Sequence, residues 1–200
     1  MIPKRLVRTV PEVVDHEQER LWRIACDLHP GWEHITLRDP VDRGNFPLTS
    51  HAWDSCEAGS ALANLIRAED LYHNGGVYID SDIEVYRPFD SLLGCEAFAA
   101  WEDPSYVPNA VMGCRPLHPA MREVAIRAAS EIPCKPWFSG VRVTTEVFVN
   151  RDDVTLLPPA SFYPWHWRQR DISDAEKAEI RAANPWSFAA HHWAASWWAK

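Results

Sequence analysis

Residues 62–82 read LANLIRAEDLYHNGGVYIDSD, and this stretch decides the fold. Its first part carries apolar residues at helical spacing, which predicts a helix. The NGG at 74–76 ends that helix, because glycine enters the left-handed conformation without steric cost. Residues 77–79 then form a short apolar strand that leads into the DSD at 80–82. A helix, a glycine turn and a buried strand in succession are typical of an α/β domain.

The DSD brings two carboxylates together. In an extended chain residues two apart point the same way, so we expect Asp80 and Asp82 to converge at the strand end. Adjacent carboxylates repel unless a cation lies between them, and Mg²⁺ and Mn²⁺ prefer such oxygen ligands. Chance alone gives about one D-x-D in a chain of this composition, so the alternative is a solvated acidic turn. The strand favours a metal site, because ligands bind at strand ends of α/β sheets.

The alternation of strands and helices continues on both sides. Asp54 and Glu57 match a capping box that would begin the helix before the glycines, and Ser173 and Glu176 match another. The predicted strands cover residues 2–7, 32–37, 77–79, 83–86 and 154–157. The predicted helices cover residues 11–28, 54–74, 119–130 and 173–184. We therefore predict an α/β fold with a mostly parallel central sheet flanked by helices.

Composition narrows the classes of protein. A chain of 200 residues with 46% hydrophobic and 24% charged residues predicts one domain over residues 1–200 and excludes a disordered protein. A net charge of −8 without a Lys/Arg cluster argues against a nucleic-acid partner. No apolar run or leader predicts a membrane span or secretion. Five cysteines without a C-x-x-C pair indicate reduced, mostly buried thiols, so we expect a cytoplasmic protein.

Two further groups of residues could carry chemistry. Asn64 and Arg67 share a face of the helix, and an arginine there could contact a phosphate or a donor hydroxyl. The alternative is an ordinary ion pair with a neighbouring carboxylate. Near the carboxyl end His191 and His192 offer imidazoles that can complete the coordination of Mn²⁺. The alternative there is an incidental pair.

Residues 62–82 also resemble a known signature, S-D-x-x-R-x-x-x-L-Y-x-x-G-G-x-Y-x-D-x-D. It belongs to the glycosyltransferases with a D-x-D-containing sugar-binding region, the group of the initiating mannosyltransferases and capsular polysaccharide glycosyltransferases. The matching residues are Arg67, Leu71, Tyr72, Gly75, Gly76, Tyr78, Asp80 and Asp82. The IPK at 2–4, HPGWE at 29–33, NAVM at 109–112 and HHWAASW at 191–197 also resemble family segments, in family order.

The resemblance implies a GT-A fold that binds a nucleoside diphosphate sugar through Mn²⁺ or Mg²⁺. The nucleotide-sugar and metal core would cover about residues 1–115, and the acceptor side and a closing tail about residues 116–200. The implied metal ligands are Asp80, Asp82 and His191, with His192 as the less favoured histidine. The implied catalytic residues are Asp80, Asp82 and Arg67. The implied donor contacts are Asn64, Arg67, Tyr72, Gly76, Tyr78, Asp80, Ser196 and Trp197.

The activity that the resemblance implies is transfer of a sugar to an acceptor hydroxyl with retention of anomeric configuration. UDP is favoured over GDP as the nucleotide of the donor. Loops that vary between relatives select acceptors, which indicates residues 38–50, 101–108 and 160–172.

Four departures from the family pattern leave alternatives open. The family's S-D is Ala63-Asn64, the His and Trp that follow I-P-K are Val7 and Val10, a G-P is Gly140-Val141, and the Gly of G-S-W is Ala195. A non-catalytic nucleotide-sugar or glycan-binding module would tolerate these changes. A metal-dependent phosphohydrolase would share the acidic pair, and it would release phosphate rather than sugar.

Overall fold

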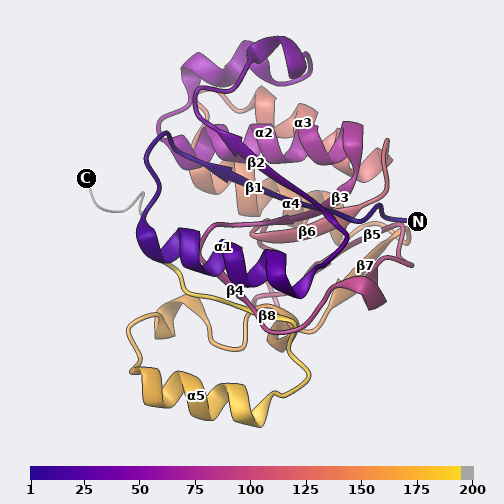
Figure 1. Ribbon diagram of the computed structural model, residues 1–200. Helices are drawn as coiled ribbons and strands as arrows, with labels where there is room; N and C mark the ends of the chain where they lie inside the picture. The colour runs from indigo at the N-terminus through magenta and orange to yellow at the C-terminus, as the bar shows by residue number, and fades with distance from the viewer. Residues whose placement is uncertain (195–200) are drawn as a thin grey trace.

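A six-stranded sheet forms the centre of the computed structural model, which describes residues 1–194 (Figure 1). Its strand order is β2-β1-β3-β6-β5-β7. The strands are β1 (Arg5–Val10), β2 (Glu33–Arg38), β3 (Gly76–Ile79), β5 (Ala97–Ala100), β6 (Val111–Cys114) and β7 (Val154–Leu157). β1 pairs parallel with β2 and β3, and β5 pairs parallel with β7, whereas β6 is antiparallel to both neighbours. The predicted α/β fold with a mostly parallel sheet is confirmed.

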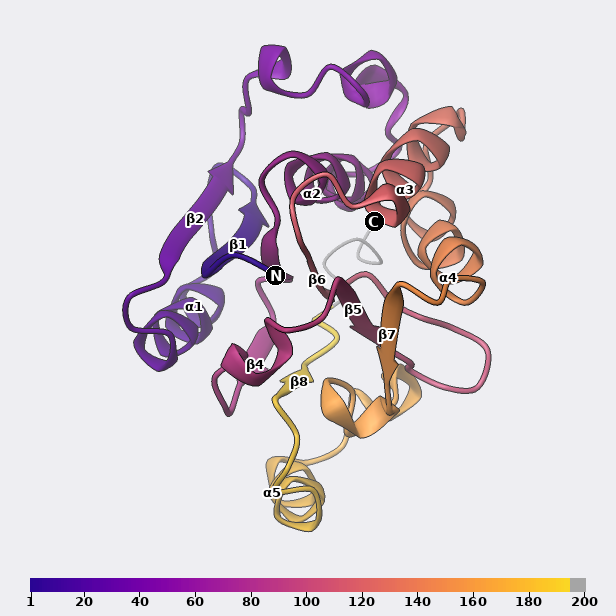
Figure 2. The ribbon, with the colours of Figure 1, turned by 90° about the vertical axis from the view of Figure 1, so that its right-hand side faces the viewer.

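Helices cover both faces of this sheet (Figure 2). They are α1 (His16–Leu28), α2 (Gly59–Asn74), α3 (Pro119–Ser130) and α4 (Val143–Phe148), whereas α5 (Asp174–Ala183) lies apart from the sheet. The alternation of side chains along β3 separates the two cores: Val77 and Ile79 pack on the side of α1, and Tyr78 packs on the side of α2, α3 and α4. Tyr78 and the residue two further on therefore face α2.

A separate two-stranded ribbon carries the end of the described chain. β4 (Ile83–Val85) pairs antiparallel with β8 (Ala189–His191), and His191 lies opposite Ile83. Figure 1 shows α5 beyond this ribbon, away from the central sheet. Among residues 1–194 no helix has the length and apolar character needed to cross a membrane.

The predicted starts of some helices and strands are wrong, because contacts between distant residues replace the expected local caps. The Asp54–Glu57 capping box is wrong: α2 begins at Gly59, and Asp54 lies in a 3₁₀ helix, where its carboxylate pairs with Arg43. The Glu57 N–H donates to the Cys134 carbonyl instead of entering a first helical turn. α1 begins at His16 rather than residue 11, and β1 begins at Arg5. The elements that the pattern did not predict are β5, β6, α4 and β8.

Candidate functional site

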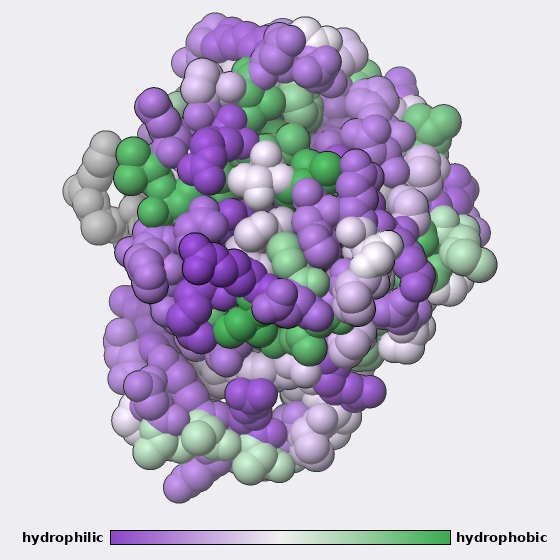
Figure 3. Space-filling model, viewed as in Figure 1, coloured by the Kyte–Doolittle hydropathy of each residue, from purple (hydrophilic) through white to green (hydrophobic). Residues whose placement is uncertain are grey.

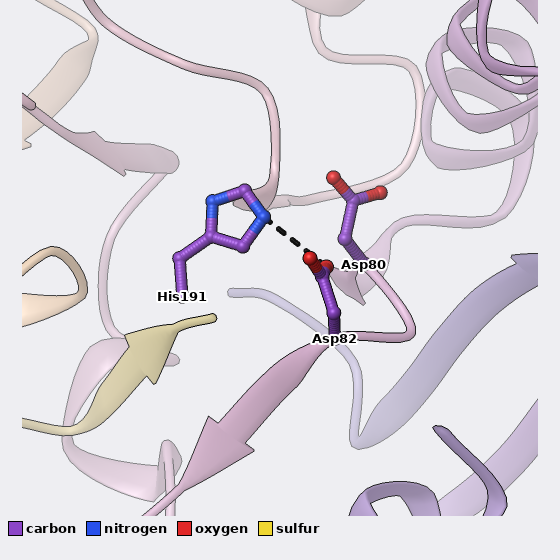
Figure 4. A group of neighbouring side chains, drawn as sticks. All are labelled: Asp80, Asp82 and His191. Atoms are coloured by element: carbon purple, nitrogen blue, oxygen red, sulfur yellow. Dashed lines mark hydrogen bonds and ion pairs between the residues drawn. The ribbon is translucent and has the colours of Figure 1, made fainter. Parts of the chain in front are cut away.

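Asp80, Asp82 and His191 form one cluster at the end of β3 (Figure 4). One ligand atom from each lies within 4.8 Å of the other two. The Nε2 atom of His191 is 3.1 Å from Oδ1 of Asp82, across a sequence separation of 109 residues. The β4–β8 pairing makes this contact possible, because it places the end of β8 beside the residue that precedes β4.

The acidic pair converges through a turn rather than through extended chain. The Ile83 N–H donates to the Asp80 carbonyl at 3.1 Å, which closes a four-residue β-turn over residues 80–83. The Asp80 N–H donates to the Ala110 carbonyl and fixes the turn to the segment before β6. The expected convergence is present, but its predicted cause is wrong.

Asp80 is held from the α2 side of the sheet. Oδ1 of Asp80 lies 2.9 Å from Nη1 of Arg67 and accepts a 2.8 Å hydrogen bond from the Tyr78 hydroxyl. Arg67 is buried on α2, its guanidinium lies over the Tyr78 ring at 4.4 Å, and it also donates to the Asn109 carbonyl at 2.9 Å. Arg67 and Tyr78 therefore fix the orientation of the Asp80 carboxylate.

His191 and Asp82 are held by the chain that follows β8. The His191 ring stacks on Trp193 at a centroid distance of 3.9 Å, and the Trp193 indole N–H donates to the Trp165 carbonyl. Oδ2 of Asp82 accepts a 2.8 Å hydrogen bond from the Ala194 N–H. The carboxylate is thus oriented by the tail on one oxygen and faces His191 with the other.

Burial and mutual charge set the protonation of the cluster. Burial raises the pKa of Asp80 by more than the nearby Arg67 lowers it. Burial would also raise the pKa of Asp82, but the charge and hydrogen bond of His191 and the Ala194 N–H lower that pKa to about 2. Burial alone would lower the pKa of His191, and the charges of Asp82 and Asp80 raise it instead. The site therefore favours positive charge between the carboxylates.

These residues fit a divalent metal ion. Two carboxylates and one imidazole are a donor set that suits Mn²⁺, and the carboxylates also suit Mg²⁺. Among residues 1–194 the buried Nδ1 atom of His191 has no hydrogen-bond partner, and Nε2 faces Asp82. Asp80, Asp82 and His191 could therefore hold such an ion.

His192 and the last predicted donor contacts stand apart from this cluster. The prediction that His192 ligates the metal is not supported, because its Nε2 atom lies 3.0 Å from Oε2 of Glu84. Adjacent residues of extended chain point to opposite sides, which separates His192 from His191. Ser196 and Trp197 lie outside the described residues.

Asn64 and Arg67 are both engaged inside the protein. The Asn64 amide donates to the Pro136 carbonyl and to the Ser139 hydroxyl, and its oxygen accepts from the Asn109 amide at 2.8 Å. The ion pair predicted as the alternative for Arg67 is wrong. Asp70 pairs with Arg5, and Glu69 accepts from the backbone of residues 48–49. Asn64 thus supports Asn109, whose carbonyl supports Arg67.

Tyr72 and Gly76 are not brought to the acidic cluster. Gly76 opens β3 and Asp80 follows its last residue, so roughly 13 Å of strand separates them. The Tyr72 carbonyl accepts from the Leu117 N–H at the same end. Gly76 has a φ of 111°, and a Cβ there would lie 2.6 Å from the Arg5 carbonyl oxygen. The structure therefore gives Gly76 a packing role, and the implied donor contacts of Tyr72 and Gly76 stay predictions.

Replacing Gly76 with alanine is expected to lower the free energy of unfolding by about 2–4 kcal/mol, from backbone strain and overlap with β1. Urea denaturation measures this. Gly59→Ala is the matched control, because a Cβ at Gly59 meets nothing within 4 Å and alanine favours the helix. If Gly76→Ala kept its stability and lost nucleotide binding, the donor contact would be restored as the explanation.

Sequence reasoning missed a second group of polar residues beside the cluster. The Glu102 side chain is buried, and Nε2 of His166 lies 3.3 Å from its Oε1 and 3.3 Å from Oδ2 of Asp103. The Tyr163 hydroxyl is buried without a hydrogen-bond partner among the described residues, and burial, together with the charges of Asp80 and Glu102, raises its pKa. Two of the loops predicted for the acceptor, 101–108 and 160–172, thus meet next to Asp80.

Known proteins match this chain in sequence and in structure. The family described as "Glycosyltransferase sugar-binding region containing DXD motif" matches residues 15–99, which include α2, β3 and the acidic pair. This match covers less than half of the chain. The matched residues supply two of the three clustered side chains, and His191 comes from outside the match.

Curated proteins that are similar to this chain include a mannosyltransferase and a mannosyl phosphorylinositol ceramide synthase. Inositol phosphoceramide mannosyltransferase 2 of Schizosaccharomyces pombe is 39% identical over 100 residues, which are 48% of this chain and 29% of that protein. Mannosyl phosphorylinositol ceramide synthase CSH1 of Saccharomyces cerevisiae is 34% identical over 129 residues, which are 62% of this chain and 34% of that protein. The chain spans about a third of the length of these relatives.

Solved glycosyltransferases share the fold at low identity. PaToxG glycosyltransferase superposes with a TM-score of 0.60 at 11% identity, over 92% of this chain and 77% of that one. A glycosyltransferase involved in glycosylation of the major capsid of PBCV-1 gives 0.57 at 12% identity, over 94% of both chains. The galactosyltransferase LgtC gives 0.54 at 11% identity, over 94% and 86%. The fold is that of GT-A glycosyltransferases.

Proposed function

We propose that this chain is a metal-dependent glycosyltransferase that moves a hexosyl group from a nucleoside diphosphate sugar to an acceptor hydroxyl. The observation that carries the proposal is the cluster of Asp80, Asp82 and His191 at the end of β3, inside a GT-A fold. The mannosyl names of the relatives support a hexosyl donor. Retention of configuration is part of the proposal, and NMR of the product's anomeric proton tests it.

The chain's own residues divide into two roles. Asp80, Asp82 and His191 would hold Mn²⁺ or Mg²⁺, which when bound stabilises the negative charge that builds on the diphosphate leaving group. Arg67 and Tyr78 orient Asp80 through its Oδ1 atom. These contacts are made before any ligand arrives, so little reorganisation is needed when the donor binds.

The acceptor side is proposed at the meeting point of loops 101–108 and 160–172. The Glu102 carboxylate and the Tyr163 hydroxyl lie there, and both can form hydrogen bonds with a sugar hydroxyl. The third predicted loop, 38–50, is not part of this proposed acceptor side. Its Phe46 packs in a separate core with Trp53 and the amino-terminal half of α2.

A nucleotide-sugar-binding module without turnover is the second candidate. It is favoured by Asn64, which stands where the family has aspartate and whose amide is committed to Pro136, Ser139 and Asn109. Incubation with donor labelled in the sugar separates the two candidates. A transferase releases nucleoside diphosphate and moves or hydrolyses the sugar, whereas a binding module retains intact donor.

Nucleoside diphosphates are expected to raise the melting temperature only together with Mn²⁺ or Mg²⁺, because bare carboxylates repel a diphosphate. A ligand at a hundred times its dissociation constant stabilises the folded state by about 2.7 kcal/mol. For a chain of this size that is roughly 5–10 °C. A thermal-shift matrix of UDP and GDP with and without each ion measures this change in melting temperature. We expect UDP to give the larger shift. If no combination shifts the midpoint, the transferase and the binding module both fail.

A further inference from the structure

Two of the five cysteines meet in the structure, far from each other in sequence. All five are free, and Cys56 and Cys134 form an isolated parallel β-bridge. The Cys134 N–H donates to the Ser55 carbonyl at 3.0 Å, and the Glu57 N–H donates to the Cys134 carbonyl at 3.0 Å. The segment that enters α2 is thereby joined to the segment that leaves α3.

The bridge places the two backbone positions at a separation that a disulfide can span. Paired residues in neighbouring strands lie about 5 Å apart, and disulfides span Cα separations of about 4.4–6.8 Å. The Cys56 thiol donates to the Ala52 carbonyl at 3.8 Å, so its side chain has to turn toward Cys134 for the two sulfur atoms to bond. Forming a bond between them therefore requires little movement of the backbone.

The two thiols differ in reactivity and exposure. The neighbouring Cys56 side chain lowers the pKa of Cys134 to about 7, in spite of burial. Burial raises the pKa of the Cys26 thiol to about 11 and raises that of Cys114 further. Since the thiolate is the nucleophile, Cys134 is the reactive sulfur of the pair. It is buried, so only a small oxidant reaches it, and the half-buried Cys56 adjoins it.

We propose that Cys56 and Cys134 are a modification site that forms a reversible intramolecular disulfide with a peroxide as the oxidant. The Cys134 thiolate attacks one oxygen of hydrogen peroxide, which breaks the O–O bond and gives a sulfenic acid; the departing hydroxide takes a proton to become water. The Cys56 sulfur then displaces the sulfenic oxygen, which leaves with the Cys56 proton as a second water. Two thiols lose two electrons, and one peroxide gains them.

The disulfide would reach the neighbourhood of the acidic cluster. Cys134 lies two residues before Pro136, whose carbonyl holds the Asn64 amide, and Ser139 holds the same amide. Closing the long loop between the cysteines restricts the unfolded chain. We expect oxidation to raise the melting temperature by roughly 5–15 °C. Dithiol reductants would reverse the bond, so the two thiols would be reduced in a reducing compartment.

The experiment treats the full chain with a small excess of hydrogen peroxide, alkylates the remaining thiols and identifies disulfide-linked peptides by mass spectrometry. We expect two of the five thiols to disappear, a single Cys56–Cys134 cross-link, a higher melting temperature, and reversal of all three by dithiothreitol. Cys95→Ser is the matched control: its thiol is half-buried and outside the pair, so the cross-link should persist. Cys56→Ser should abolish the cross-link and leave Cys134 as an over-oxidised thiol.

Two outcomes would overturn the proposal. One is a folded chain in which Cys134 remains reduced after other thiols have been oxidised. The other is a cross-link between any other pair in the folded protein. Chain oxidised in urea gives the reference distribution of cross-links for a sequence that holds no preferred pair. Neither outcome bears on the glycosyltransferase proposal, because the measurement uses no donor.

Discussion

Asp82→Asn is expected to abolish the metal-dependent binding of nucleoside diphosphate and to lower sugar transfer by more than about 100-fold. An amide oxygen is an uncharged and weaker ligand for a divalent ion, and the supporting shell of a metal site alone is worth 10–100-fold. The substitution also removes the negative charge that His191 faces at 3.1 Å. Nucleotide-dependent thermal shifts at increasing Mn²⁺ and turnover of labelled donor measure the two effects.

Glu84→Gln provides the matched control for Asp82. Glu84 is the next carboxylate along the same chain segment, but it pairs with His192 and stands outside the cluster. Its loss should leave the shift with Mn²⁺ and nucleotide within a few degrees of that of the unchanged protein. If Asp82→Asn behaved like Glu84→Gln at saturating Mn²⁺, Asp82 would be removed from the metal site.

Arg67→Met is expected to lower the free energy of unfolding by about 2–4 kcal/mol and to abolish donor binding. The substitution leaves Asp80 without its charged partner in a largely buried position. Removing one partner of a buried ion pair leaves the other charge uncompensated, which destabilises the fold by more than the intact pair stabilised it. The Asp80 side chain keeps 25% of its surface exposed, which holds the cost below that of a fully buried charge. Urea denaturation measures the stability, and thermal shifts with nucleotide and Mn²⁺ measure the binding.

A second substitution separates positioning from folding. Arg67→Met combined with Asp80→Asn removes both charges, so we expect it to recover much of the lost stability without recovering nucleotide binding. Arg142→Met is the surface control, because its pair with Glu146 is exposed and should contribute little to stability. If the double variant were no more stable than Arg67→Met, Arg67 would stabilise the fold through contacts other than Asp80.

The sequence predicts this site best where local order and chain direction suffice. Residues 62–82 place a helix, a strand and an acidic pair in immediate succession, and the structure keeps all three in that order. The helix start was misplaced because it depends on Cys134, which is distant in sequence. β5 and β6 were missed because short buried strands carry little periodicity.

The remaining side chains of the site meet only through tertiary pairing. His191 reaches Asp82 because β8 pairs with β4, and nothing local in the tail indicates that strand. Asn64 reads as a surface neighbour of Arg67, whereas the structure turns it toward Asn109. Tyr163 and Glu102 are ordinary loop residues in sequence. Only the folded chain brings the Glu102 carboxylate close to the Tyr163 hydroxyl.

The β4–β8 ribbon also determines at which stage of protein synthesis the three clustered side chains can come together. Ribosomes deliver the chain from its amino end, so the acidic pair emerges long before His191, its partner 109 residues later. Until residue 191 has left the exit tunnel, the two carboxylates lack the imidazole and the tail contacts that orient them. The nascent protein therefore carries the two carboxylates without the imidazole that completes the cluster, so the proposed metal site is assembled late in synthesis.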